Sequence, residues 1–181
     1  MSELDAHALA VEVPAGWEGR IFRRAEAGEA RMASAAVQMG VPAVAGASAP
    51  PGEKTMPLVH LATVPLPHDA ADYGAGIVET LGAGDAFVVL KEFDAAEAGE
   101  AIFEREGIPR DIDPDVFDPA ALQRRLPNQA GTQVFFHEAS RAFCLYAVLG
   151  DYARRHEVVP RINEVLATVR IEPRVQEGPT D

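Results

Sequence analysis

Apolar residues along the chain fall into short runs that proline, glycine or charged residues interrupt. Short runs rich in β-branched and aromatic residues are typical of strands in a sheet. We expect strands at residues 8–13, 19–24, 58–64 and 86–90. Pro57 and Pro65 bracket the third of these runs, so we expect them to set its limits.

A hairpin is predicted near the C-terminal third of the chain. Residues 132–137 and 142–149 are β-branched and aromatic runs, and the four residues between them match the length of a hairpin connection. We therefore expect these two runs to form an antiparallel pair, and we place this pair at the centre of the sheet.

The last helix is predicted by periodicity. Apolar side chains recur there at steps of three and four residues, which is typical of an amphipathic helix that packs on a sheet. These side chains are Val158, Ile162, Val165, Leu166 and Val169, and Pro160 is expected in the first turn.

Other helices are predicted from capping signals. Asp94 and Glu97 have the spacing of a capping box, which predicts a helix that continues to Glu106. Shorter helices are expected at residues 73–81 and 120–125, the first ended by Gly82 in a left-handed conformation. A weak strand at 35–39 and a loop at 46–52 complete the pattern.

These elements predict one α+β domain. Strands dominate the order, and the chain of 181 residues, 48% apolar, is long enough for one core. We expect a mostly antiparallel β-sheet flanked by helices over residues 1–172, followed by a polar tail at 173–181.

Charge and cysteine content narrow the class of partner and the compartment. Sixteen Lys and Arg against 28 Asp and Glu give a net charge of −12, which disfavours nucleic acid and anionic membranes as partners. The start lacks the pattern of a secretory signal, no run is long enough to span a membrane, and Cys144 has no second cysteine to pair with. We expect a cytoplasmic protein.

Motifs for cofactors and metals are incomplete. The glycines at Gly74 and Gly76 begin like a dinucleotide-binding loop, but Glu79 stands where the third glycine is required. Asp111, Asp113 and Asp115 alternate like the first half of a calcium loop, but the glycine and glutamate of the second half do not follow, and no two histidines have zinc-binding spacing. We expect neither a cofactor nor a metal.

An acidic segment is the main candidate for binding. Residues 94–118 contain nine acidic residues and two arginines, and so carry −7 of the net charge. Phe103 and Phe117 are candidate apolar anchors of a protein-docking surface. The carboxylates expected to steer a basic partner protein are Glu100, Glu104, Asp111, Asp113 and Asp115. A solvated face that binds nothing remains the alternative for this segment.

Two other functions stay open. His60, His137, Cys144 and Tyr146 lie in predicted strands and could line a pocket on the sheet, as in a small-molecule-binding domain or a modest hydrolase. Buried structural residues are the alternative for all four. Homo-oligomer formation is a third interpretation, because arginines gather near both ends of the chain, away from the acidic segment.

Two short motifs carry a resemblance. With PAGWEGR at residues 14–20 and FCLY at residues 143–146, the chain resembles a family of uncharacterised actinobacterial proteins. Its layout is also similar to the PsbP-like α/β sandwich, in which an antiparallel sheet lies between helices. That resemblance implies a binding or accessory function rather than an enzyme, and it carries no site residue across.

Overall fold

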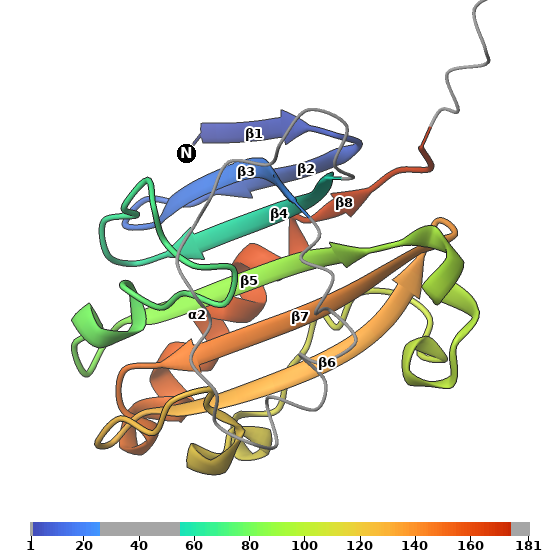
Figure 1. Cartoon of the computed structure of the whole chain (residues 1–181). Helices are drawn as coiled ribbons and strands as arrows, with labels where there is room; N and C mark the ends of the chain where they lie inside the picture. Colours follow the sequence, from blue (N-terminus) through green and yellow to red (C-terminus); the bar gives the residue numbers. More distant parts are fainter. Residues whose placement is uncertain (1, 26–54, 175–181) are drawn as a thin grey trace, which may run out of the picture.

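The computed structural model describes residues 2–25 and 55–174 (Figure 1). These residues form antiparallel strands and one α-helix, so the α+β class and the antiparallel pairing predicted from the sequence are confirmed. The strands are β1 Ser2–Ala6, β2 Leu9–Val13, β3 Glu18–Ala25, β4 Thr55–Ala62, β5 Ala86–Phe93, β6 Ala130–Glu138, β7 Arg141–Leu149 and β8 Arg170–Ile171, and the helix is α2 Arg155–Ala167.

The strands form two sheets. One sheet has the order β1-β2-β8, and the other has the order β3-β4-β5-β7-β6. Strands β1 and β8 were not predicted, whereas every strand predicted within the described residues is present. The limit expected at Pro57 is wrong, because β4 begins at Thr55 and Pro57 pairs with Arg23. Strand β5 pairs with β4 only from Leu58 onward, so Pro57 lies outside that ladder.

The predicted hairpin is present, but its place in the sheet differs from the prediction. Ala139 and Ser140 connect β6 to β7 with φ angles of 53° and 59°, the left-handed pair that suits a tight hairpin turn. The centre of the larger sheet is β5, and β6 is an edge strand. The reason is that β5 pairs with both β4 and β7, and the hydrophobic pattern alone does not specify which neighbour each strand takes.

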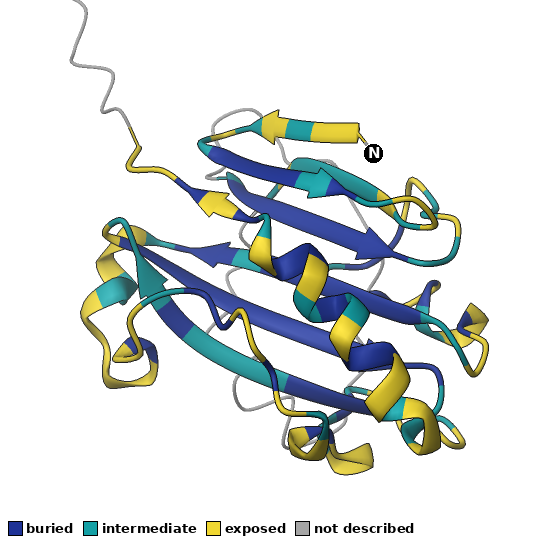
Figure 2. Ribbon diagram, turned by 180° about the vertical axis from the view of Figure 1, so that it is seen from behind, coloured by how far each residue is buried: buried dark blue, intermediate teal, exposed yellow. Residues whose placement is uncertain are grey.

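Helix α2 lies across one face of the larger sheet (Figure 2). Its apolar side, with Val158, Ile162 and Leu166, is buried against β2 and the sheet, as the periodicity predicts. Pro160 lies inside the helix rather than in its first turn. The helix begins earlier because a 3₁₀ turn, η6 Tyr152–Arg154, leads directly into it, with Asp151 accepting a hydrogen bond from the amide of Ala153.

The other predicted helices are wrong, because the chain forms short 3₁₀ turns instead. Asp94 does cap a turn, but Glu100 has an extended conformation and separates two turns. Gly82 is not left-handed. Asp118 caps a turn of only three residues. The turns are η1 Val78–Thr80, η2 Ala95–Gly99, η3 Ala101–Phe103, η4 Pro114–Val116 and η5 Pro119–Ala121. The strand expected at 35–39 and the loop at 46–52 lie outside the described residues.

The two faces of the larger sheet have different covers. We call the face toward α2 the inner face, and its side chains, such as Val59 and Leu145, belong to the main core. The opposite, outer face carries alternate residues of the same strands, including Val89 and Val148. Ala70, Ile77 and Leu81 pack on this outer face from the connection between β4 and β5.

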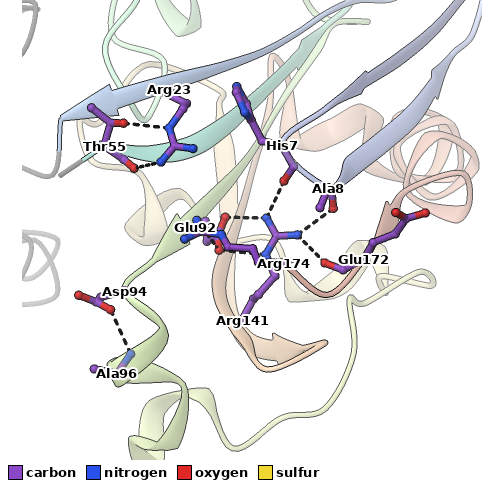
Figure 3. A network of polar contacts seen from close by, with 10 residues as sticks. All are labelled: His7, Ala8, Arg23, Thr55, Glu92, Asp94, Ala96, Arg141, Glu172 and Arg174. Carbon is purple, nitrogen blue, oxygen red and sulfur yellow. Dashed lines mark hydrogen bonds and ion pairs between the residues drawn. The ribbon is translucent and has the colours of Figure 1, made fainter. Parts of the chain in front are cut away.

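A buried arginine of the larger sheet, paired with a glutamate of the same sheet, reaches across to the smaller sheet (Figure 3). The Arg141 guanidinium donates from Nε and Nη2 to the carboxylate oxygens of Glu92, at 2.9 and 2.7 Å, and both side chains are 2% exposed. Arg141 also donates to the backbone carbonyls of His7, Ala8 and Glu172. One side chain of β7 therefore holds the turn between β1 and β2 and the residue that follows β8.

Candidate functional site

The acidic segment, residues 94–118, lies along the edge of the larger sheet. Turn η3 packs against β6, and Glu106 and Asp118 form isolated bridges with His137 and Gly131 of that strand. The predicted segment is therefore placed beside the open side of an edge strand rather than on a helix.

The predicted steering carboxylates differ in how they are held. Asp113 accepts a hydrogen bond from the amide of Asp115 and so caps η4. Asp115 accepts from Arg155 Nε at 2.9 Å, and this hydrogen bond lowers the pKa of Asp115 below its usual value. Asp111 is 3.5 Å from Asn163 Nδ2. The two remaining carboxylates, Glu100 and Glu104, are exposed and form no ion pair with another described residue.

The candidate anchors Phe103 and Phe117 are buried, since each is only 2% exposed. Phe103 packs against Phe93 and Phe135, with ring centroids 5.4 and 5.6 Å apart. Phe117 belongs to the main core with α2. Both phenylalanines hold the acidic segment on the domain, and neither is available to a partner in this conformation.

Their neighbours along the chain are exposed instead. Ile102 is 43% exposed and Val116 is 53% exposed, and they are the large apolar side chains that lie at the surface of the described residues. The sequence marks both as part of the apolar component of the segment, but it does not distinguish them from the neighbouring phenylalanines as the exposed members. The Asp113-Pro114 turn signal was present, but a three-residue turn has no periodicity that says which side chain faces inward.

The four predicted pocket residues project from the outer face of the larger sheet. His60 and Tyr146 lie in one row across the strands, with Val89 between them. Cys144 and His137 lie further along the same face, on β7 and β6. Within the part of the chain that the structure describes, no hydrogen bond joins any two of the four.

Each of the two histidines is bound to the backbone. His60 Nε2 donates to the carbonyl of Asp72 at 2.9 Å, and its ring packs edge-on against Phe22 and Phe87. Burial lowers the pKa of His60 to about 4, so its ring is neutral at pH 7. His137 Nδ1 donates to the carbonyl of Phe103. Neither ring is placed to accept a proton from Cys144.

The thiol and the phenol are equally unsuited to nucleophilic chemistry. Burial raises the pKa of Cys144 to about 12, and its sulfur accepts from Gln133 Nε2 at 3.1 Å. Burial also raises the pKa of Tyr146 to about 12, and the amide of Gln123 donates to its hydroxyl at 3.4 Å. The geometry therefore favours packing for these side chains and gives no support to the hydrolase alternative.

A charged cluster on the same face was not predicted. Asp72 accepts from Lys91 at 2.9 Å and from Arg24 at 2.8 Å. Burial opposes the ionisation of Asp72, but the two cations outweigh it and hold its pKa below the usual value. Arg24 also donates to the carbonyl of Ala70, and Arg20 donates to that of Pro67. These contacts fasten the connection between β4 and β5 onto the sheet.

Across residues 2–25 and 55–174, no group of three or more His, Cys, Asp or Glu side chains could hold a metal ion. No helix in that part of the chain has the length and apolar character needed to cross a bilayer. Comparison of the chain with protein-family models, with curated proteins and with solved structures gave no match.

Proposed function

We propose that this protein is a non-catalytic interaction domain that binds a basic partner protein through its acidic segment. The observation that carries the proposal is the exposure of Ile102 and Val116 within a stretch of net charge −7. Exposed apolar side chains inside a charged rim are typical of protein-binding surfaces. Glu100 and Glu104 lie nearest to Ile102 in sequence and supply the long-range attraction.

The layout supports an accessory function of the PsbP-like kind. An antiparallel sheet with a C-terminal helix on one face is compatible with that sandwich, whose members are generally binding or accessory proteins. A single, buried, free cysteine supports a reducing compartment such as the cytoplasm. Both statements are part of the proposal.

Charge reversal tests the proposal. The variant Glu100→Lys/Glu104→Lys/Asp111→Lys changes the net charge of the segment by about +6 and leaves the side-chain caps Asp94, Asp113 and Asp118 and the Asp115 ion pair in place. The matched control, Asp5→Lys/Asp69→Lys/Glu164→Lys, makes the same charge change at exposed sites outside the segment. Each protein is used for affinity capture and mass spectrometry, after circular dichroism has shown that it is folded.

The outcome depends on one comparison. We expect the wild type and the control to capture the same partner protein. Both should also bind this partner when the two proteins are purified and mixed. The charge-reversed variant should bind the purified partner at least about tenfold more weakly. Equal binding by the reversed variant would refute the proposal.

A further inference from the structure

The edge of β6 has an open stretch between two closed ends. At one end the amide and carbonyl of Gly131 bond with Asp118, at 3.1 and 2.9 Å. At the other end the amide of His137 donates to Arg105 and its carbonyl accepts from Gly107, both at 2.8 Å. Chain segments from the acidic region therefore cover both ends of this edge.

The backbone of Gln133 and Phe135 faces outward between those ends. In an antiparallel ladder, alternate residues of an edge strand direct both backbone groups away from their partner strand. Gly131 and His137 bond outward, so Gln133 and Phe135, which lie between them at steps of two residues, also direct their backbone groups outward. None of the described residues bonds to these two amides or these two carbonyls.

Burial along β6 marks the same stretch. The strand is buried over residues 130–132 and again at Phe136, but residues 133–135 are partly exposed. The gap between the two closed ends of this edge extends along residues 132–136. At about 3.4 Å per residue, it is roughly 17 Å long. An extended segment of about five residues fits between the two closed ends.

The surroundings of the gap match a partner with both apolar and basic residues. Exposed Ile102 belongs to η3, which packs against β6, and exposed Val116 precedes the bridge at Asp118. The side chains of Glu106 and Asp118, one at each end, are exposed and form no ion pair with another described residue. Apolar contacts and carboxylates therefore frame the four unpaired backbone groups.

We propose that this open edge binds an extended, basic segment of the partner protein as an additional strand. The segment would form four backbone hydrogen bonds with Gln133 and Phe135, while its basic side chains reach Glu106 and Asp118. A second copy of this chain is a poorer occupant, because pairing β6 with β6 brings two strongly acidic segments together. The inference rests on the proposed function and specifies how the acidic segment binds its partner.

A synthetic peptide provides the probe. It has valine, threonine and valine between two pairs of lysines, with both ends blocked. One control peptide has glutamates in place of the lysines, and another carries methyl groups on its three central backbone nitrogens, which removes their hydrogen bonds. Fluorescence anisotropy measures binding, and hydrogen exchange followed by NMR reports on the amides of Gln133 and Phe135.

We expect the wild type to bind the lysine peptide at least about tenfold more tightly than either control peptide, since charge and backbone hydrogen bonds both contribute. The amides of Gln133 and Phe135 should exchange rapidly in the free protein and at least about tenfold more slowly with the peptide bound. The lysine peptide and its methylated control are both measured with the wild-type protein. Their comparison is therefore valid whether or not a variant of the protein folds.

A pair of variants tests the strand directly. Gln133→Pro removes the outward amide hydrogen and leaves the ladder with β7, because that amide does not donate to β7. Gln133→Ala is the matched control, since both changes lose the hydrogen bond to Cys144 but only proline loses the amide. Binding should weaken at least about tenfold for the proline variant relative to the alanine variant.

Several results would overturn the inference. These are slow exchange of the two amides in the free protein, equal binding of the methylated peptide, no binding of the lysine peptide, and protection of the amides through a concentration-dependent dimer. In each case the capture experiment with the charge-reversed variant still decides the proposed function separately, because that experiment does not involve β6.

Discussion

Removing the buried guanidinium of Arg141 should destabilise the protein strongly. The change Arg141→Ala leaves the carboxylate of Glu92, which is 2% exposed, without its principal partner. The backbone carbonyls of His7 and Glu172 also lose a charged donor. Arg174 still reaches Glu92 at 2.9 Å, so part of the charge stays compensated.

The magnitude follows from the cost of an unpaired buried charge. Truncating one partner of a buried ion pair typically costs about 3–5 kcal/mol, which is a large share of a total stability of about 5–15 kcal/mol. With an m value of about 2 kcal/mol per molar urea, the unfolding midpoint should fall by roughly 1.5–2.5 M. An exposed pair is worth only about 0–1 kcal/mol, so Arg154→Ala, which breaks the pair with Glu157, is the control.

Urea unfolding followed by the fluorescence of Trp17, the single tryptophan, measures the effect. A double variant, Arg141→Met/Glu92→Met, removes both charges and should recover at least about 1 kcal/mol relative to Arg141→Met alone. A loss no larger than that of the control, or a double variant that merely adds the two single losses, would show that this buried ion pair does not stabilise the fold as argued.

Three further predictions concern buried positions. Burial lowers the pKa of His60 from 6.5 to about 4, so the unfolded chain takes up the additional proton and stability is lost as the pH falls from about 6.5 toward 4. Between pH 7.5 and 5 this loss is about 2 kcal/mol, so the decrease in the free energy of unfolding, measured with urea, should be larger in the wild type than in His60→Phe by about this amount. Burial raises the pKa of Cys144 to about 12, so a thiol reagent at pH 8 should label only the unfolded protein, and rapid labelling of the native protein would contradict this. A Cβ atom at Gly150 would lie 1.8 Å from the carbonyl oxygen of Gly82, so Gly150→Ala should lower the free energy of unfolding by about 2–3 kcal/mol, whereas Gly99→Ala, with no atom within 4 Å, should change it by less than about 1 kcal/mol.

The sequence pattern was sufficient for the elements that have a clear period. Apolar runs located β2 to β7, and steps of three and four residues located α2. The hairpin followed from the spacing of the two runs beside it, although its turn has two residues, Ala139 and Ser140, rather than the four expected. These features are local, so neighbouring residues contain the information that specifies them.

The remaining features depend on contacts between distant residues. The edge position of β6 is set by the pairing of β7 with β5, and the separation of η2 from η3 is set by the extended backbone of Glu100. Burial of Phe103 instead of Ile102 follows from the way η3 packs on β6. The exposed side chains of the candidate site could therefore be predicted only from the register of the sheet, which no motif in the sequence specifies.

The pairing of β8 with β2 affects how the protein folds during synthesis. Leu9 pairs with Ile171, so β2 has to wait for a partner strand that is synthesised long after it. Contacts of such long separation close late, and the apolar side of β2 remains uncovered until then. A pause in translation before residue 171 would prolong the lifetime of this unpaired strand and favour aggregation of the nascent chain.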